Sequence, residues 1–131
     1  VKGMNFAFSG LLTYASKRVG KISATDLCFS LMETAFAELC EASERALLMT
    51  NKSEVIVCGG VAQNIVLMEK MKQMAGLHGA KCSTCENQYN ADNGGMIALL
   101  GAREMERKGK KAAILPQNMW YEQKWRIDQV E

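Results

Sequence analysis

The chain has 131 residues, which is enough for one domain with a core but too few for the two lobes that usually enclose a nucleotide. Its 16 basic and 14 acidic residues leave a net charge of +2, a field too weak to indicate nucleic acid or membrane binding by itself. These residues contain no signal-peptide pattern, long apolar span or low-complexity tract. We therefore expect a cytosolic fragment or truncated gene product, without membrane contact and with any RNA contact confined to a local surface.

The cysteines and the single histidine indicate the compartment more than the chemistry. Five cysteines are an odd number and lie mostly in apolar patterns, as buried reduced thiols do, so we expect the cytoplasm, with the nucleus also open. Cys82 and Cys85 form a C-x-x-C pair, but in an extended run residues three apart point to opposite faces. This orientation, and the lack of a second Cys/His pair to complete a tetrahedral site, disfavour zinc or redox chemistry at the two cysteines. His78 is interpreted as an exposed helix-end residue.

The first part of the chain predicts a short strand followed by two helices. Residues 4–8 are strand-like, 11–19 helical, and 25–49 form the main helix, where Glu41 and Arg45 are spaced for an ion pair. Apolar residues recur every fourth position along the main helix: Leu27, Leu31, Ala35 and Leu39. This apolar stripe is wide enough to pack against a sheet.

In the middle of the chain, a β-branched run gives way to a glycine turn and a helix. Residues 55–58 are continuously apolar, which is typical of an interior strand covered on both faces. The turn carries Gly59, Gly60 and Asn64, and a helical period follows to residue 77. Free N–H groups and the dipole at such a helix start favour an anion such as phosphate. By its type and position alone, Asn64 is a turn or helix-cap residue.

A second turn repeats this arrangement downstream. A strand near 81–84, a loop and a helix over 93–108 complete a β-α-β-α order, which predicts an α/β layer fold with parallel strands. The turn carries Asp92 before Gly94 and Gly95, and a carboxylate at that place is ordinarily a helix N-cap. One such turn is weak support for a nucleotide site, but two in tandem indicate half of a nucleotide cleft.

The last part of the chain combines positive charge with aromatic rings. A basic cluster lies at a helix C-terminus: Arg103, Arg107, Lys108, Lys110 and Lys111. A solvated helix end, stabilised by the dipole, is the default interpretation, and an RNA contact is the alternative. Trp120, Tyr121 and Trp125 follow, and such rings either pin a tail onto its own domain or bind a partner.

Several motifs together resemble a known family. They are residues 2–4 with 8–10, 26–31, 59–64 and 92–98, and the similarity continues to residue 131. In this order they are similar to the tRNA threonylcarbamoyladenosine synthases, the catalytic subunit of the KEOPS complex in eukaryotes and archaea. This family was formerly called O-sialoglycoprotein endopeptidase or glycoprotease. Only its second, C-terminal half is matched.

The resemblance implies an α/β fold, one lobe of an actin-like and Hsp70-like (ASKHA, ribonuclease H-like) ATPase fold. Residues 1–115 are then the C-terminal lobe, and residues 116–131 are a tail packed on it. The family transfers a threonylcarbamoyl group from its adenylate to the adenine at position thirty-seven of tRNAs that read codons beginning with A. We expect a lobe that is inactive alone, because a missing N-terminal lobe supplies the rest of the cleft.

The resemblance also implies roles for particular residues. It assigns five of them to the nucleotide or substrate: Ser9, Gly10, Gly59, Gly60 and Asn64. Asn64 matches the asparagine that holds the nucleotide sugar or adenylate, and the glycine pair before it matches the phosphate-side turn. Asp92 matches a metal ligand, whose family partners are the histidines of an H-x-x-x-H motif that these residues lack. No catalytic residue is assigned.

The implied ligands are one divalent metal, whether iron, zinc or magnesium, and threonylcarbamoyl-adenylate or ATP. The implied partners are tRNA and the KEOPS subunits, including a small protein kinase. Three residues depart from the family pattern: Asn5 and Ala7, where aspartate and serine are usual, and Gly95, where alanine is common. These departures are compatible with neutral drift or with a loss of catalytic demand.

Three other interpretations stay open. A non-catalytic module would dock the KEOPS kinase subunit or tRNA through the basic and aromatic tail. A metallo-glycoprotease is disfavoured, because nothing resembles H-E-x-x-H and no nucleophile stands beside a base. A sugar kinase of the same superfamily fits the first glycine turn, but not the motifs around Ser9 and Asp92.

Overall fold

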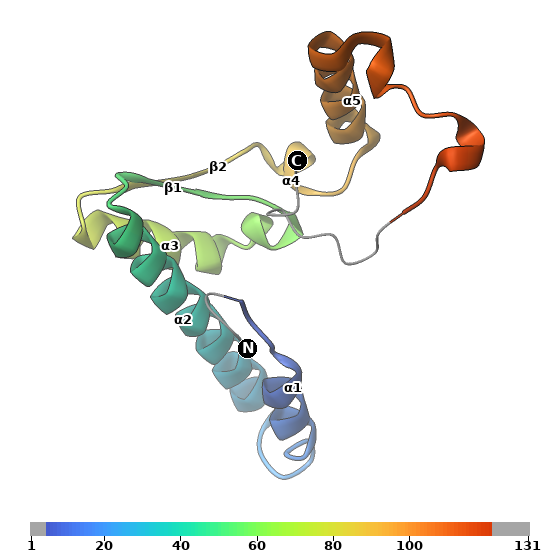
Figure 1. Cartoon of the computed structure of the whole chain (residues 1–131). Coiled ribbons are helices and arrows are strands. Elements are labelled where there is room, and N and C mark those ends of the chain that lie inside the picture. The colour runs from blue at the N-terminus through green and yellow to red at the C-terminus, as the bar shows by residue number, and fades with distance from the viewer. Residues whose placement is uncertain (1–4, 122–131) are drawn as a thin grey trace. The chain divides into compact units, whose positions relative to one another are not determined.

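The computed structural model describes residues 5–121, and its contacts divide the chain into two compact units, Val1–Asp92 and Asn93–Glu131 (Figure 1). The first unit contains α1 (Ser9–Ser16), α2 (Ala24–Thr50), β1 (Glu54–Val57), the 3-10 helix η1 (Gly60–Gln63), α3 (Ile65–Leu77), β2 (Lys81–Thr84) and α4 (Asn87–Asn90). The second unit contains α5 (Gly94–Lys108) and the 3-10 helices η2 (Gly109–Ala112) and η3 (Pro116–Asn118). No helix within the described ranges is both long enough and apolar enough to span a bilayer.

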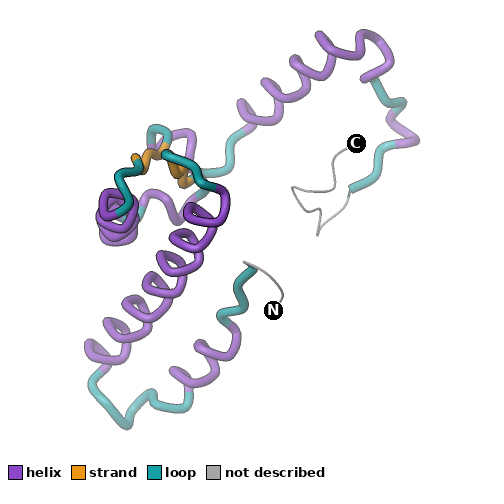
Figure 2. The backbone as a smooth tube through the Cα atoms, turned by 60° about the vertical axis from the view of Figure 1, so that its left-hand side comes forward, coloured by secondary structure: helices purple, strands orange, loops and turns teal. Residues whose placement is uncertain are grey.

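The two strands, which are orange in Figure 2, pair in parallel. Val55 lies opposite Cys82, and Val57 opposite Thr84. Parallel strands need a crossover connection, and α3 provides it. The predicted β-α-β-α order and its parallel pairing are therefore confirmed, with α5 following in the second unit.

The core lies between the helices α2 and α3 and one face of the sheet. Its buried members are Phe36, Leu47, Leu67, Met71 and Met74. Val55 and Val57 pack against this cluster, whereas Ile56 is 70% exposed, because successive strand side chains point to opposite faces. The prediction of a strand covered on both faces is wrong for the described residues. A continuous apolar run predicts that both faces of the strand are buried. It does not say which element packs on the face of the sheet opposite α2 and α3.

Helix α2 is the longest element, and its buried side chains lie from Phe36 onward. The predicted stripe is half-buried, and the buried side chains of α2 are instead Phe36, Ala42 and Leu47. The predicted pair of Glu41 and Arg45 forms at 3.5 Å. The N-terminal half of α2 contacts α1, and Figure 1 shows α1 beside it.

Other boundaries differ from the predictions. Residues 5–8 form no strand, because the described sheet offers them no pairing partner, while Met4 lies outside the described residues. The rings of Phe6 and Phe8 stack there with centroids 5.6 Å apart. Helix α1 begins at Ser9 and ends before residue 17, so the range 11–19 was shifted toward the C-terminus. The short helix α4 forms where a loop was expected.

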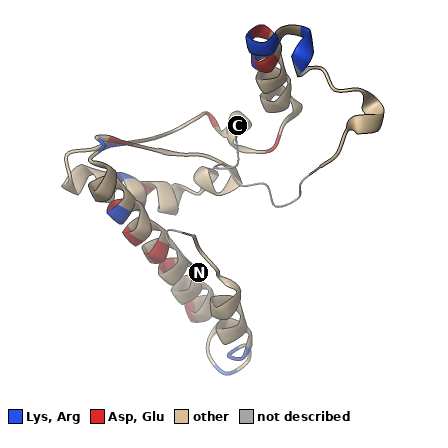
Figure 3. Ribbon diagram, viewed as in Figure 1, with Lys and Arg blue, Asp and Glu red and all other residues tan. Residues whose placement is uncertain are grey.

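In the second unit, the helix predicted over 93–108 is confirmed as α5. None of its side chains is buried, and Ile97, Leu99 and Leu100 are exposed. In the ribbon of Figure 3, Lys and Arg positions occur at the C-terminal end of α5 and in η2, with acidic positions among them. Of the predicted tail, residues 116–121 are described, whereas Trp125 lies outside the described residues. A lobe boundary at residue 115 stays a prediction.

Candidate functional site

The first turn lies directly after β1 and is shaped by its glycines. Gly59 has φ +98°, a backbone conformation that side chains rarely adopt. A Cβ added at Gly59 or Gly60 would meet no atom within 4 Å, so the space before this backbone is open. Ala62, only 2% exposed, anchors the turn from inside. The turn therefore presents backbone that a ligand can approach closely.

Asn64 ends this turn and begins α3. Its side-chain oxygen accepts a hydrogen bond from the Leu67 N–H at 3.1 Å, which is an N-cap bond. The interpretation of Asn64 as a cap residue is thus confirmed. Because the oxygen serves the helix, a ligand would meet the N–H donors of the side-chain amide. Asn64 is half-buried, which leaves room for such a contact.

The second turn differs from the prediction at one residue. The N-cap of α5 is Asn93, whose side-chain oxygen accepts from the Met96 N–H at 3.1 Å. Asp92 is exposed and precedes the cap, so the prediction that it caps the helix is wrong. A Cβ at Gly95 would approach the Asn93 side-chain oxygen to 3.1 Å. Glycine at this position therefore accommodates the asparagine cap.

Two side chains that sequence reasoning missed hold the segment before Asp92. Asn90 is only 3% exposed, and its amide donates to Thr84 Oγ1 at 2.9 Å and to the Cys85 carbonyl at 3.1 Å. Gln63 Nε2 donates to the Asn87 carbonyl at 2.9 Å and so joins η1 to α4. The first turn and the segment leading to Asp92 are therefore connected through α4. No sequence signal identifies these bonds, since asparagine and glutamine in a loop usually face solvent.

The structure groups some of the predicted site residues and separates others. Gly59, Gly60 and Asn64 share one turn. Ser9 and Gly10 form the first turn of a different helix, α1, which packs on α2. They are exposed, and the Ser9 carbonyl accepts from Thr13 Oγ1 at 2.9 Å. Their assignment to the nucleotide stays a prediction.

The side chains of the described segment do not fit a metal ion by themselves. Across residues 5–121, no three His, Cys, Asp or Glu side chains group closely enough to hold one. Asp92 offers one exposed carboxylate, which is fewer ligands than any resident divalent metal needs. Burial raises the pKa of the Cys82 thiol within the core, while the exposed Cys85 donates to the Asn90 oxygen at 2.8 Å. These two thiols thus lie in different environments.

His78 lies at the C-terminal end of α3, exposed as predicted. Its Nε2 lies 2.5 Å from Oε1 of Glu44 in α2. This partner was not foreseen, because it is 34 residues away in the chain. The pair links α2 to α3 at the edge of the core.

A parallel strand pair, a helical crossover and two strand-to-helix turns define a mixed α/β segment. The family model for tRNA N6-adenosine threonylcarbamoyltransferase matches residues 1–99. The chain is 41% identical over 136 residues to the enzyme of that name from Staphylothermus marinus, and 42% identical over 134 residues to that from Aeropyrum pernix. Both alignments cover all of this chain. The chain therefore belongs to the tRNA N6-adenosine threonylcarbamoyltransferase family, as its motifs predicted.

The chain spans only part of its relatives' length. It covers 39% of the Staphylothermus marinus protein and 37% of the Aeropyrum pernix protein. It is also 54% identical over 102 residues, 77% of this chain, to a probable bifunctional tRNA threonylcarbamoyladenosine biosynthesis protein from Methanobrevibacter smithii, of which it covers 19%. The family implies an actin-like fold, and the α/β arrangement of the described residues is consistent with one.

Proposed function

We propose that this chain is the C-terminal lobe of a tRNA N-threonylcarbamoyltransferase. The reaction moves a threonylcarbamoyl group from threonylcarbamoyl-adenylate to the adenine at position thirty-seven of tRNAs that read codons beginning with A. Family membership over residues 1–99 carries this proposal. The lobe supplies part of a nucleotide-binding wall in the cytoplasm and transfers nothing alone, because half a cleft cannot position both reactants.

The geometry of the first turn supports the nucleotide wall. The open backbone at Gly59 and Gly60 allows a phosphate to approach, and the capped Asn64 keeps its amide donors for a ribose hydroxyl or a phosphate oxygen. Asp92 would contribute one carboxylate to a divalent metal whose other ligands lie outside these residues. We derive no step of the reaction through that metal.

A chimera tests the proposal, because the chain spans only part of its relatives. This chain would replace the matching segment of the Staphylothermus marinus enzyme, and threonylcarbamoyl incorporation into tRNA would be measured with that relative's own remaining residues in place. We expect the chimera to transfer the group. Asp92→Ala in the same chimera should lower transfer by on the order of a hundredfold or more, the scale of losing a metal ligand.

A folded chimera without activity would contradict the proposal. Circular dichroism and gel filtration establish folding independently of transfer. A chimera that carries aspartate at Asn5, serine at Ala7 and alanine at Gly95 is the matched control for the three departures. If only this control chimera transfers the threonylcarbamoyl group, the unchanged chain has lost the catalytic role. Docking of the KEOPS kinase subunit then becomes the better interpretation.

A further inference from the structure

The net positive charge of this protein belongs to its second unit. The first unit, Val1–Asp92, holds nine basic and nine acidic residues and is neutral, and the second unit, Asn93–Glu131, has a net charge of +2. Within the second unit, residues 93–121 hold five basic and two acidic residues, a net charge of +3. A weak overall charge therefore conceals a local basic surface, and such asymmetry along a chain is typical of nucleic-acid contact.

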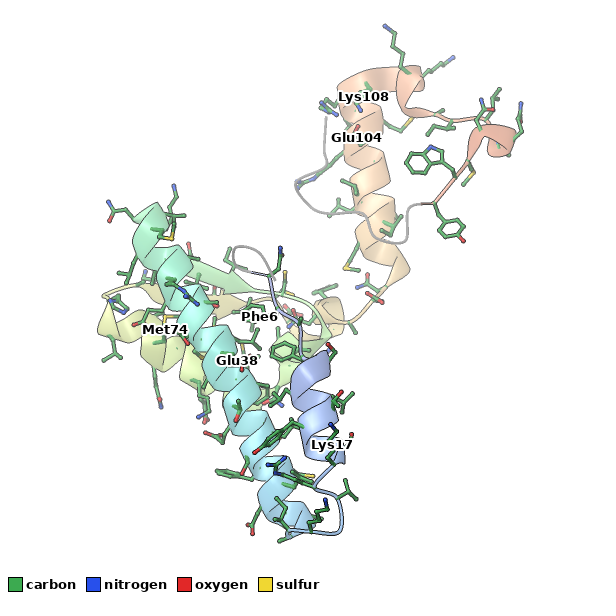
Figure 4. All side chains as sticks on the ribbon, turned by 60° about the horizontal axis from the view of Figure 1, so that its bottom comes forward. Phe6, Lys17, Glu38, Met74, Glu104 and Lys108 are labelled. Carbon is green, nitrogen blue, oxygen red and sulfur yellow. The ribbon has the colours of Figure 1, made fainter. Side chains whose placement is uncertain are left out.

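Not all of these cations are equally available. Glu104 forms ion pairs with Arg107 at 3.1 Å and with Lys108 at 3.0 Å. Figure 4 labels Glu104 and Lys108 on α5. Hydrogen bonds from Arg107 and Lys108 hold the pKa of the Glu104 carboxyl below its usual value. The carboxylate stays charged and offsets part of their charge. Lys110 and Lys111 follow in η2, are exposed, and form no ion pair within residues 5–121. Together with Arg103, which is also exposed and forms no ion pair within the same residues, they are the cations most available to a phosphate.

Aromatic side chains lie in the same unit a few residues further on. Trp120 is 74% exposed and Tyr121 is 87% exposed, directly after η3. Rings this large are ordinarily buried or at least half-covered. Exposed rings in the same unit as exposed lysines are suited to stacking on unpaired bases while the lysines contact the backbone. A protein interface is the poorer match, because lysine is depleted at such interfaces.

We propose that residues 103–121 form an RNA-binding surface, in which Lys110 and Lys111 contact phosphates and Trp120 and Tyr121 stack on unpaired bases. This inference rests on the proposed function and deepens it, since it names the surface of this chain that holds the tRNA. It needs neither a nucleotide, a metal nor the other lobe, so it can be tested on the chain by itself.

The experiment measures binding of a labelled RNA stem-loop to the whole chain at several salt concentrations. Lys110→Glu/Lys111→Glu should weaken binding by on the order of tenfold or more at low salt, and should reduce the slope of log affinity against log salt by about 1.4 for two lost phosphate contacts. Lys17→Glu/Lys21→Glu is the matched control, because both lysines are exposed in the first unit and the net charge changes equally. This control should weaken binding far less.

Trp120→Ala tests the stacking half of the proposal. It should weaken binding by roughly tenfold and leave the salt slope unchanged, because stacking releases no counterions. Equal effects of the two lysine pairs, or no effect of Trp120→Ala, would overturn the proposal, and so would a chain that binds no RNA at low salt. A chimera that transfers normally despite such a result would leave the proposed function standing.

Discussion

Asn64 and Asn93 have the same local task at the two turns, since each side-chain oxygen accepts the N–H three residues further along its helix. This bond fixes the side-chain oxygen and thereby orients the amide nitrogen of the same side chain. Under the proposed function, only the amide donors of Asn64 remain for a nucleotide. The cap and the proposed contact then depend on different atoms of one side chain, and substitutions can separate them.

Asn64→Asp keeps the capping oxygen and removes the amide donors. We expect the free energy of unfolding of the chain to change by less than about 0.5 kcal/mol, whereas Asn64→Ala loses about 1 kcal/mol. In the chimera, Asn64→Asp should lower transfer by on the order of tenfold or more, through lost hydrogen bonds to the ligand. Urea unfolding and tRNA modification assays measure the two effects. Equal transfer by wild-type and Asn64→Asp chimeras would remove Asn64 from the nucleotide contacts.

At the scale of elements, α4 is a short helix whose position depends on side-chain bonds at both ends. Gln63 binds it from η1, and Asn90 binds it to the end of β2. A helix of four residues has little stability of its own, so these bonds determine where the chain continues toward Asp92. The first turn and the segment that leads to Asp92 are thus connected by residues that the sequence did not single out.

Gln63→Ala removes the bond to the Asn87 carbonyl, and Gln63 is exposed, so the core is not disturbed. We expect amide hydrogen exchange over residues 87–92 to become roughly fivefold faster, as the loss of about 1 kcal/mol of local stability predicts. Gln88→Ala is the control, because Gln88 bonds only locally, to Glu86. If exchange over 87–92 is the same in both variants, Gln63 does not hold α4.

At the scale of the whole molecule, the two units differ in how their helices are covered. Helix α3 buries Leu67, Met68, Met71, Met74 and Ala75 against its neighbours. Helix α5 buries no side chain, although it carries seven apolar residues against eight in α3. Helices owe most of their stability to packing of an apolar face, so the two helices should open with different free energies.

We expect amides of α5 to exchange on the order of a hundredfold faster than those of α3 in this chain. Native-state hydrogen exchange followed by mass spectrometry measures both helices in one sample. In the chimera, protection of α5 should rise if the rest of the enzyme covers its apolar residues. Equal protection of α3 and α5 in the isolated chain would contradict the division into two units.

The sequence by itself determined what depends on local order. The ion pair of Glu41 and Arg45, the strand–helix–strand order, the cap at Asn64 and the helix over 93–108 all follow from residues close in the chain. The motifs also determined the family, because their order along the chain is a property of the sequence and needs no structure to be recognised. Helical period, capping and turn chemistry depend on residues within a few positions of one another, so they can be read from the sequence.

Only the tertiary structure decided which surfaces meet. The bond from Gln63 to α4 and the pairing of His78 with Glu44 join residues 24 and 34 positions apart in the chain. The open face at Ile56 and the burial of Asn90 depend on which elements pack over each residue. The structure also decided that Asn93 and not Asp92 caps α5, since both residue types cap equally well. Long-range pairing depends on how elements pack, and packing is a property of the folded chain as a whole.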